Sequence, residues 1–299
     1  MKTRLAWVAL LAGAAGAGAQ RLDTNDWSRP TEPFRVAGPV HFVGTGELGA
    51  YLVATSAGHV LIDGGLPSSA PVIEAAIRRL GFDPKDLRVL LTTQAHFDHV
   101  GSLAYFKKLS GARVEVMDGD APVVESGGRQ DYLFGGPGNE AYQYEPVRVD
   151  RVLKDGDTVT LGGVTLTARR TPGHTPGSTT WLTTVDEAGK SYLVVFAASV
   201  SINPGTRFLD RPSYPGIADD FARSFALLES LRPDIFLGSH TSFFSMEEKR
   251  ARLKAGAVPH SFVDPEGFRA HVAAKKRQFE ELLAREKAGL RSGAASSSP

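Results

Sequence analysis

Short apolar runs broken by glycine-rich turns alternate along the chain with longer segments whose apolar positions recur at helical spacing. Short runs rich in β-branched and other apolar residues, bounded by turn residues, predict strands. Gly162-Gly163 separates two such runs and predicts a tight hairpin. The expected strands are residues 41–43, 50–54, 60–62, 89–91, 114–117, 158–161, 164–168, 192–197 and 235–237.

Helical spacing of apolar residues recurs in four segments. The first is expected to begin after Ser68 or Ser69, with Pro71 in its first turn, and to end at Gly81. Because such helices follow several of the expected strands, the pattern indicates an α/β fold. The expected helices are residues 70–80, 100–109, 219–231 and 268–287.

Polar turns follow four of the expected strands, at residues 94–99, 174, 199–201 and 240. Ligand sites in α/β sheets gather at the carboxyl ends of strands, so these turns can converge on one place. A long loop at residues 126–146, rich in glycine and tyrosine, has no clear period, and such a loop in a compact domain is more often functional than idle.

Four of the eight histidines lie in these turns. His96, Asp98 and His99 are so close in sequence that a tight turn can direct His96 to one side and the other two to the other side. Zn²⁺ prefers imidazole nitrogen and carboxylate oxygen, and a hydrolytic zinc site keeps one position open for water. The sequence therefore predicts a zinc site for one or two adjacent ions, to which His174 and His240 also contribute ligands. The histidines outside the turns are His41, His59, His260 and His271.

Composition narrows the class of protein. The chain has 299 residues, of which 42% are hydrophobic and 22% are charged, enough to bury a large core. A formal net charge of +1 gives no field that would collect nucleic acid or acidic lipid, so a small neutral or mildly anionic substrate fits better. The absence of cysteine removes disulfides and thiolate ligands, which leaves imidazole, carboxylate and amide oxygen for a metal.

The N-terminus has the pattern of an export signal. Lys2 and Arg4 precede an uncharged apolar run at residues 5–15, and residues 17–19 are small, as a signal peptidase requires. The run is too short for a membrane-spanning anchor, which takes about 20 apolar residues. We therefore expect a periplasmic protein. Its expected parts are a signal peptide at 1–19, a polar lead at 20–32, one domain at 33–288 and a low-complexity, disordered tail at 289–299.

A family resemblance rests on four motifs. Gln94-Ala95-His96-Phe97-Asp98-His99 resembles the His-x-His-x-Asp-His signature of the metallo-β-lactamase superfamily. The other motifs of that superfamily match in order at residues 61–65, 171–178 and 238–240, and the similarity covers roughly residues 33–285. It implies a four-layer αβ/βα sandwich with the metal site at the strand ends between two sheets.

The finer resemblance is to subclass B3 β-lactamases. Many hydrolases of the superfamily carry an aspartate that bridges two metals after the strand at 192–197, whereas this chain has Ser199 there. Ser199 and Ser201, together with the stretch 149–159, look like subclass B3. The resemblance implies one metal held by Gln94, His96 and His174 and a second metal held by Asp98, His99 and His240.

Gln94 departs from the common pattern. An amide oxygen is a weaker zinc ligand than imidazole, so the first site should lose affinity while the second keeps its full set of ligands. A GOB-type minority of subclass B3 enzymes is similar in having glutamine here. The alternative is that Gln94 points away and binds no metal, and neither spacing nor ligand softness decides between the two.

The resemblance also implies a mechanism. Zinc lowers the pKa of bound water to about 7, which gives a nucleophile for the lactam carbonyl at neutral pH. Asp98 would orient that water and relay its proton, and a carboxylate such as Asp63 can fix the orientation of an imidazole. Ser199 and Ser201 would bind a substrate carboxylate or the water, or else serve only as turn residues. If the first site is weak, activity should survive with a single zinc per chain.

Two other functions remain open. A hydrolase of the same fold could open lactones or thioesters, although the missing bridging aspartate argues against it. A zinc-binding or partner-binding protein without catalysis is a second alternative, but structural zinc sites are usually closed by four protein ligands, and each site expected here has three. The sequence does not indicate which β-lactams would be preferred or what the oligomeric state is.

Overall fold

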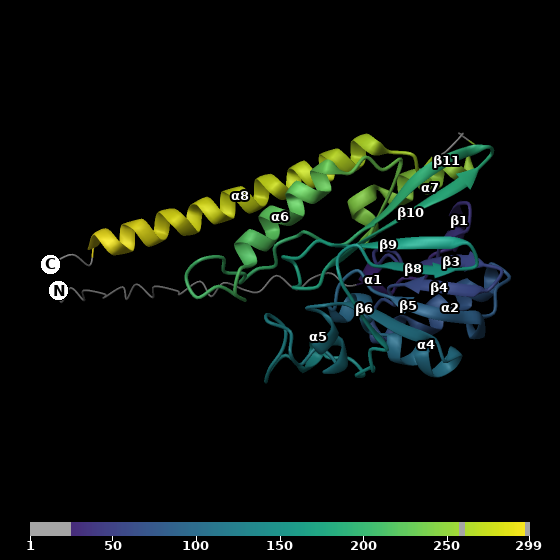
Figure 1. Ribbon diagram of the computed structural model, residues 1–299, viewed down its shortest axis with the longest axis horizontal. Coiled ribbons are helices and arrows are strands. Elements are labelled where there is room, and N and C mark those ends of the chain that lie inside the picture. The colour runs from purple at the N-terminus through teal and green to yellow at the C-terminus, as the bar shows by residue number, and fades with distance from the viewer. Residues whose placement is uncertain (1–24, 257–260, 297–299) are drawn as a thin grey trace, which may run out of the picture.

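Two β-sheets packed face to face, with helices on both outer surfaces, form the core of the computed structural model (Figure 1). The structure describes residues 25–256 and 261–296. The first sheet has seven strands: β1 Phe34–Ala37, β2 Val40–Phe42, β3 Tyr51–Thr55, β4 Gly58–Ile62, β5 Leu87–Leu91, β6 Arg113–Met117 and β7 Arg151–Leu153. The second has five strands: β8 Thr158–Leu161, β9 Val164–Arg170, β10 Thr179–Glu187, β11 Lys190–Ala197 and β12 Ile235–Gly238.

Helices cover the outer face of each sheet, so the predicted α/β class and four-layer arrangement are confirmed. Figure 1 shows α2 and α4 below the first sheet, and α6 beside the long helix α8 on the other side of the molecule. The helices are α1 Asn25–Ser28, α2 Ala70–Arg79, α3 Phe97–Val100, α4 Leu103–Ser110, α5 Ala121–Glu125, α6 Ile217–Ser230, α7 Met246–Lys254 and α8 Pro265–Ser296.

Strand order brings the carboxyl ends of key strands together. In the first sheet the strands follow one another in sequence order, and β4 to β7 are parallel. In the second sheet the order is β12-β11-β10-β9-β8, with β11 and β12 parallel. The turns after β4 and β5 therefore open at one edge of their sheet, and those after β11 and β12 open at one edge of the other.

Alternation along the inner strands divides the apolar residues between two cores. In β3 and β4, Tyr51, Val53 and Ile62 face the second sheet, whereas Leu52 and Leu61 pack in the cluster that includes α2 and α4. These strands are buried on both faces, which is why they read as nearly continuous apolar runs in the sequence. Burial on both sides fixes their register, since a slip by one residue would exchange the two cores.

β10 is a strand that the sequence analysis missed. It pairs with both β9 and β11, so it lies in the middle of the second sheet. The indole Nε1 of its fully buried Trp181 donates to the carbonyl of Thr92 at 3.0 Å, and the backbone N–H of Thr179 donates to the carbonyl of Thr93 at 2.7 Å. β10 therefore anchors the start of the turn that contains Gln94, His96, Asp98 and His99.

Other boundaries differ from the expectation. The helix expected at 100–109 is two helices, α3 and α4, and α8 continues to Ser296, into the segment where a tail was expected. Ser69 precedes α2 as expected, but its hydroxyl accepts from the N–H of Leu66 instead of capping the helix. The expected signal peptide at 1–19 lies outside the described residues. Within residues 25–256 and 261–296, no helix has the length and apolarity to cross a membrane.

Candidate metal centre

Five strand ends supply the predicted site residues. Asp63 follows β4, Gln94 and His96 lie between β5 and α3, Asp98 and His99 lie within the short helix α3, and His174 follows β9. Ser199 and Ser201 follow β11, and His240 follows β12. The two sheets thus contribute to one place, as the sequence predicts.

One cluster contains Asp98, His99 and His240. Their ligand atoms all lie within 4.8 Å of one another. The Oδ2 atom of Asp98 is 3.2 Å from Nε2 of His99 and 3.6 Å from Nε2 of His240. A carboxylate oxygen and two imidazole nitrogens at these separations form three corners of a tetrahedral zinc site, with the fourth corner left for water.

The first cluster, named after the first metal site expected from the sequence, pairs His96 with His174, and the Asp98 group is the second cluster. Nδ1 of His96 lies 3.1 Å from Nε2 of His174, and the rings are nearly perpendicular. Nδ1 of His174 lies 2.7 Å from the carbonyl oxygen of Ser201, which can only accept, so this nitrogen carries the proton and Nε2 keeps its lone pair. His174 therefore presents a metal-binding lone pair toward His96.

Gln94 contacts the turn that follows β11. Its Oε1 accepts from the backbone N–H of Ser199 at 3.2 Å, which occupies one of the two oxygen lone pairs. Its Nε2 is buried and has no hydrogen-bond partner among the described residues. The structure thus places the Gln94 amide beside the backbone of Ser199 and leaves one of its oxygen lone pairs without a hydrogen bond in the described chain.

Each of three histidines has a carboxylate behind it. Asp131 Oδ2 is 3.3 Å from His96 Nε2 and Asp63 Oδ2 is 3.5 Å from His99 Nδ1. Glu47 Oε1 is 3.6 Å from His240 Nδ1. A carboxylate placed there fixes the orientation and the tautomer of a metal-binding imidazole. Asp63 was predicted for this position, but Glu47 and Asp131 were not.

Asp63 is itself held firmly. Its two carboxylate oxygens accept from the N–H and the hydroxyl of Thr93, both at 2.7 Å. Its backbone has a φ of 62°, in the left-handed region that aspartate tolerates better than most residues. Asp63 therefore ties the turn after β4 to the turn after β5, directly behind His99.

In the metal-free chain, electrostatics hold Asp98 and His174 in their metal-binding forms, whereas His99 must release a proton when a cation binds. Burial alone would raise the pKa of Asp98, but His99 and His240 outweigh it and hold that pKa well below its usual range. Burial lowers the pKa of His99, yet Asp98 and Asp63 together raise it to about 10. Burial holds the pKa of His174 far below its ordinary value, with a further contribution from His96. An ionised carboxylate and a neutral imidazole are the forms that bind metal.

The donor atoms fit a zinc ion. Both ring nitrogens of His99 are buried and have no hydrogen-bond partner in the described part of the chain. The same is true of Nε2 of His96. Buried polar groups are normally satisfied, so orphaned nitrogens facing a carboxylate and other imidazoles indicate a missing electrophile. Nitrogen donors with few carboxylates suit zinc better than magnesium or calcium.

Aromatic side chains border the clusters. Trp27, in the lead expected to precede ordered structure, lies 5.7 Å from the ring of His240 and 6.2 Å from that of Phe97. On the other side, Phe134 lies edge-on against His96 at 5.1 Å and stacks on Tyr142. Loop 126–146 therefore contacts the site, as its lack of periodicity suggested.

The two serines have different environments. Ser199 is only 1% exposed, and its hydroxyl accepts from the N–H of Ser201 at 3.1 Å. This is the turn role that the sequence left open for Ser199. Ser201 is partly exposed, and its carbonyl holds His174.

Asp120 is a further buried acid that sequence reasoning missed. Its carboxylate accepts from the hydroxyl of Thr175 and the N–H of Gly177, both at 2.7 Å, and so holds the turn that follows His174. Burial raises the pKa of Asp120 to about 6 despite these bonds. No spacing pattern in the sequence connects Asp120 to residues 175–177, so no signal was available.

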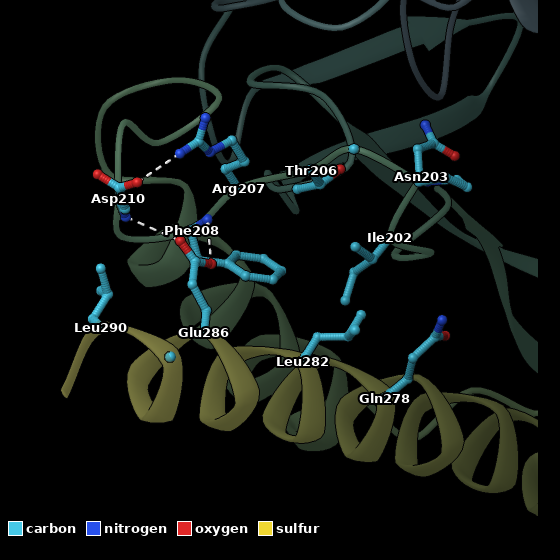
Figure 2. Close-up of a pocket in the computed structure, with 13 residues that line it drawn as sticks. Ile202, Asn203, Thr206, Arg207, Phe208, Asp210, Gln278, Leu282, Glu286 and Leu290 are labelled. Atoms are coloured by element: carbon cyan, nitrogen blue, oxygen red, sulfur yellow. Dashed lines mark hydrogen bonds and ion pairs between the residues drawn. The ribbon is translucent and has the colours of Figure 1, made fainter. Parts of the chain in front are cut away.

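A separate cavity of about 650 Å³ lies between α8 and the loop that follows Ser201 (Figure 2). Ile202, Phe208 and Leu282 line it, and Glu286 accepts from three backbone N–H groups at residues 208–210. None of the predicted metal ligands lines this cavity. It is therefore distinct from the candidate metal centre.

The histidines outside the turns have ordinary packing roles. His41 and His59 both lie edge-on against Phe82, and His271 packs near Phe236 and Phe243. His260 lies outside the described residues. The sequence separated four histidines in polar turns from four others, and the described members of the second group lie outside the candidate metal centre.

Comparison with solved structures points to one group of enzymes. FEZ-1, a metallo-β-lactamase from Legionella gormanii, is 40% identical, with a TM-score of 0.84 over 87% of this chain and 98% of that chain. BJP-1, a subclass B3 metallo-β-lactamase of Bradyrhizobium japonicum, is 36% identical, with a TM-score of 0.83 over 89% of this chain and 99% of that chain.

Similarity to curated proteins is more mixed. A probable metallo-hydrolase from Burkholderia pseudomallei is 32% identical over 56% of this chain, and an N-acyl homoserine lactonase from a Bacillus species is 26% identical over 51%. The chain spans 54% and 64% of the lengths of these two relatives. The sequence profile described as "Metallo-beta-lactamase superfamily" matches residues 50–240.

Proposed function

The chain belongs to the metallo-β-lactamase superfamily, and on this basis we propose that it is a zinc-dependent β-lactamase of the subclass B3 type. Its substrates would be penicillins, cephalosporins and carbapenems, whose lactam amide it would hydrolyse. The supporting observation is the arrangement around residues 94–99, where a His96–His174 pair lies beside the Asp98 cluster and Ser199 takes the place of a bridging carboxylate.

The charge around the two clusters supports a tighter second site. Asp98 belongs to the second cluster, and Asp63 and Glu47 stand behind two of its histidines. The first cluster has the neutral Gln94 and only Asp131 behind His96. A divalent cation gains more from several nearby carboxylates than from one, so the second site would fill first and activity would survive with one zinc per chain.

A zinc ion held by these residues would supply the Lewis acidity that activates water and offsets charge on the departing nitrogen. Asp98 directs Oδ2 toward His99 and His240, and Oδ1 makes no hydrogen bond to another described residue. We propose that Oδ1 accepts a proton from the attacking water. Attack forms a C–O bond at the lactam carbonyl, the C–N bond breaks, and Asp98 returns the proton to the nitrogen.

The walls of the site would position the substrate. Ser201 stands at the rim beside His174, where its hydroxyl can donate to a substrate carboxylate. Trp27 and Phe97 offer apolar surface on the side of His240. We also propose export to the periplasm, which rests on the charged and apolar pattern of residues 1–19.

Carbapenem turnover, measured with and without a chelator, tests the proposal. The zinc-loaded protein should open the lactam, the chelator should abolish turnover, and added zinc should restore it. Asp98→Asn should lower kcat by at least about 100-fold, since it removes the proton carrier and the only charged ligand of the second metal. A purified, zinc-loaded protein that opens no β-lactam would refute this function.

A lactonase is the second candidate, favoured by the similarity to an N-acyl homoserine lactonase. The same protein should be offered an acyl-homoserine lactone in parallel. Preference for the lactone, judged by kcat/KM, would assign the site to ester opening. Ser199 argues for the lactam, because the resemblance associates the bridging carboxylate with the other hydrolases of the superfamily.

A further inference from the structure

Asp131, in the loop at residues 126–146, lies behind the first cluster with a side chain that is only 4% exposed. Its Oδ1 accepts from the backbone N–H groups of Leu133 and Phe134, at 2.8 and 2.6 Å, and so closes a tight turn. Its Oδ2 is 3.3 Å from Nε2 of His96, and neither of these two atoms has a hydrogen-bond partner in the described chain. A small shift of the imidazole would turn this contact into a hydrogen bond.

Asp131 decides which nitrogen of His96 carries the proton. A carboxylate oxygen only accepts, so Nε2 facing it is stabilised as N–H, which leaves the lone pair on Nδ1. In the metal-free chain a hydrogen bond joins Nδ1 of His96 and Nε2 of His174 at 3.1 Å; with the proton on Nε2 of His96 instead, two lone pairs would face each other across this distance. Two facing lone pairs repel each other unless a cation lies between them.

An amide cannot replace this carboxylate. Asp131 needs both oxygens as acceptors: Oδ1 accepts from the turn, and Oδ2 faces the imidazole at 3.3 Å. Asparagine has one accepting oxygen and a donating NH₂ group, so in either orientation a donor would face a donor. With the oxygen kept on the two backbone N–H groups, the NH₂ group would favour the tautomer of His96 that has its proton on Nδ1. That proton would close the first site by pointing at His174.

We propose that Asp131 is the positioning residue for the first metal, and that it links the occupancy of this site to the conformation of loop 126–146. One carboxylate holds both the turn of the loop and the imidazole that binds the cation. Whatever fixes His96 therefore also fixes Asp131, and the coupling is reciprocal. The inference rests on the first metal site of the proposed function but not on the identity of the substrate.

Titration of the metal-free protein with Co²⁺, followed by its d–d absorption, measures both affinities without any substrate. Wild type should bind two equivalents, the tighter one at the Asp98 cluster. Asp131→Asn should lower the affinity for the weaker-binding Co²⁺ equivalent by about 10- to 100-fold. It should leave the affinity for the tighter-binding equivalent unchanged within about twofold. Glu140→Gln is the matched control: it makes the same change of charge in the same loop, at an exposed side chain that contacts only the loop's own backbone.

Hydrogen exchange in the wild type provides a measurement that does not depend on a variant. The amides of Leu133 and Phe134 should exchange more slowly after the second equivalent of Co²⁺ than after the first. Three results would each overturn the proposal. They are binding of only one equivalent of Co²⁺ by wild type, equal Co²⁺ affinities in Asp131→Asn and wild type, and amide exchange that does not change when the second equivalent binds. Equal weakening of both sites by Asp131→Asn would also overturn it, since that result indicates a structural role. A failure to hydrolyse β-lactams would refute the proposed substrate and leave these readouts unaffected.

Discussion

Replacing Asp120 with asparagine should relieve a cost of burial and keep the hydrogen bonds. Asp120 is fully buried, and its carboxylate accepts from Thr175 and Gly177. An asparagine oxygen can accept from the N–H of Gly177, and its NH₂ group can donate to the hydroxyl of Thr175, which accepts as readily as it donates. The turn after His174 should therefore survive in Asp120→Asn.

The size of the effect follows from the raised pKa. Burial moves the pKa of Asp120 from 3.8 to about 6, which corresponds to about 3 kcal/mol. Below about pH 4 both folded and unfolded chains hold the proton, and Asp120 has no effect on stability. Between pH 4 and 6 the unfolded chain ionises first, so the wild type loses stability as pH rises. Above pH 6 the folded chain ionises too, and the full loss remains.

The assay is urea unfolding of the metal-free wild type and Asp120→Asn at pH 4, 5, 6 and 7. All other titrating groups are common to both proteins, so the difference in unfolding free energy isolates Asp120. That difference should shift in favour of Asp120→Asn by about 2 kcal/mol between pH 4 and 7, because the unfolded carboxyl is already partly ionised at pH 4. A difference that stays constant with pH would refute the reasoning, because it would mean that burial does not disfavour the charge.

Three further substitutions test the centre and its support. Gln94→His should tighten the first site by at least about tenfold in a Co²⁺ titration, since imidazole is the better ligand, and unchanged affinity would place residue 94 outside the site. Glu47→Gln should weaken the second site by about tenfold in the same titration, because Glu47 lies 3.6 Å behind His240, and a change at the first site alone would contradict this. Trp181→Ala should lower the unfolding free energy in urea by about 3–5 kcal/mol, because the indole is fully buried and bonded to Thr92, and a loss below about 1 kcal/mol would show that the sheets do not depend on it.

Local patterns explain why much of the fold could be predicted. Strands such as β3 and β4 are buried on both faces and read as apolar runs, and α2 and α6 have clear helical spacing. β10 was missed because Thr180 and Thr183 are buried in it as polar residues. The hydroxyl of Thr183 donates to the carbonyl of Thr165 in β9, and the hydroxyl of Thr180 bonds to that of Thr171, directly after β9. A pattern of hydrophobicity cannot show a hydroxyl that is buried with its partner.

The sequence by itself determined the kinds of ligand and the strand ends that carry them. Four histidines and Asp98 stand directly after strands, and the carboxyl ends of strands meet, so their convergence follows from position in the chain. The absence of cysteine fixed the choice of donor atoms. These inferences need only the order of residues and the geometry that all α/β folds share.

Only the tertiary structure decided what stands behind each ligand. Glu47 faces His240 and Asp131 faces His96 because loops far apart in the chain run past the same strand ends. Loops have no period, so the sequence gives no rule for the side of a loop on which a carboxylate lies. A carboxylate acts on an imidazole only across a few ångströms, so in our proposal these contacts set the proton positions of the imidazoles and the relative affinity of the two metal sites.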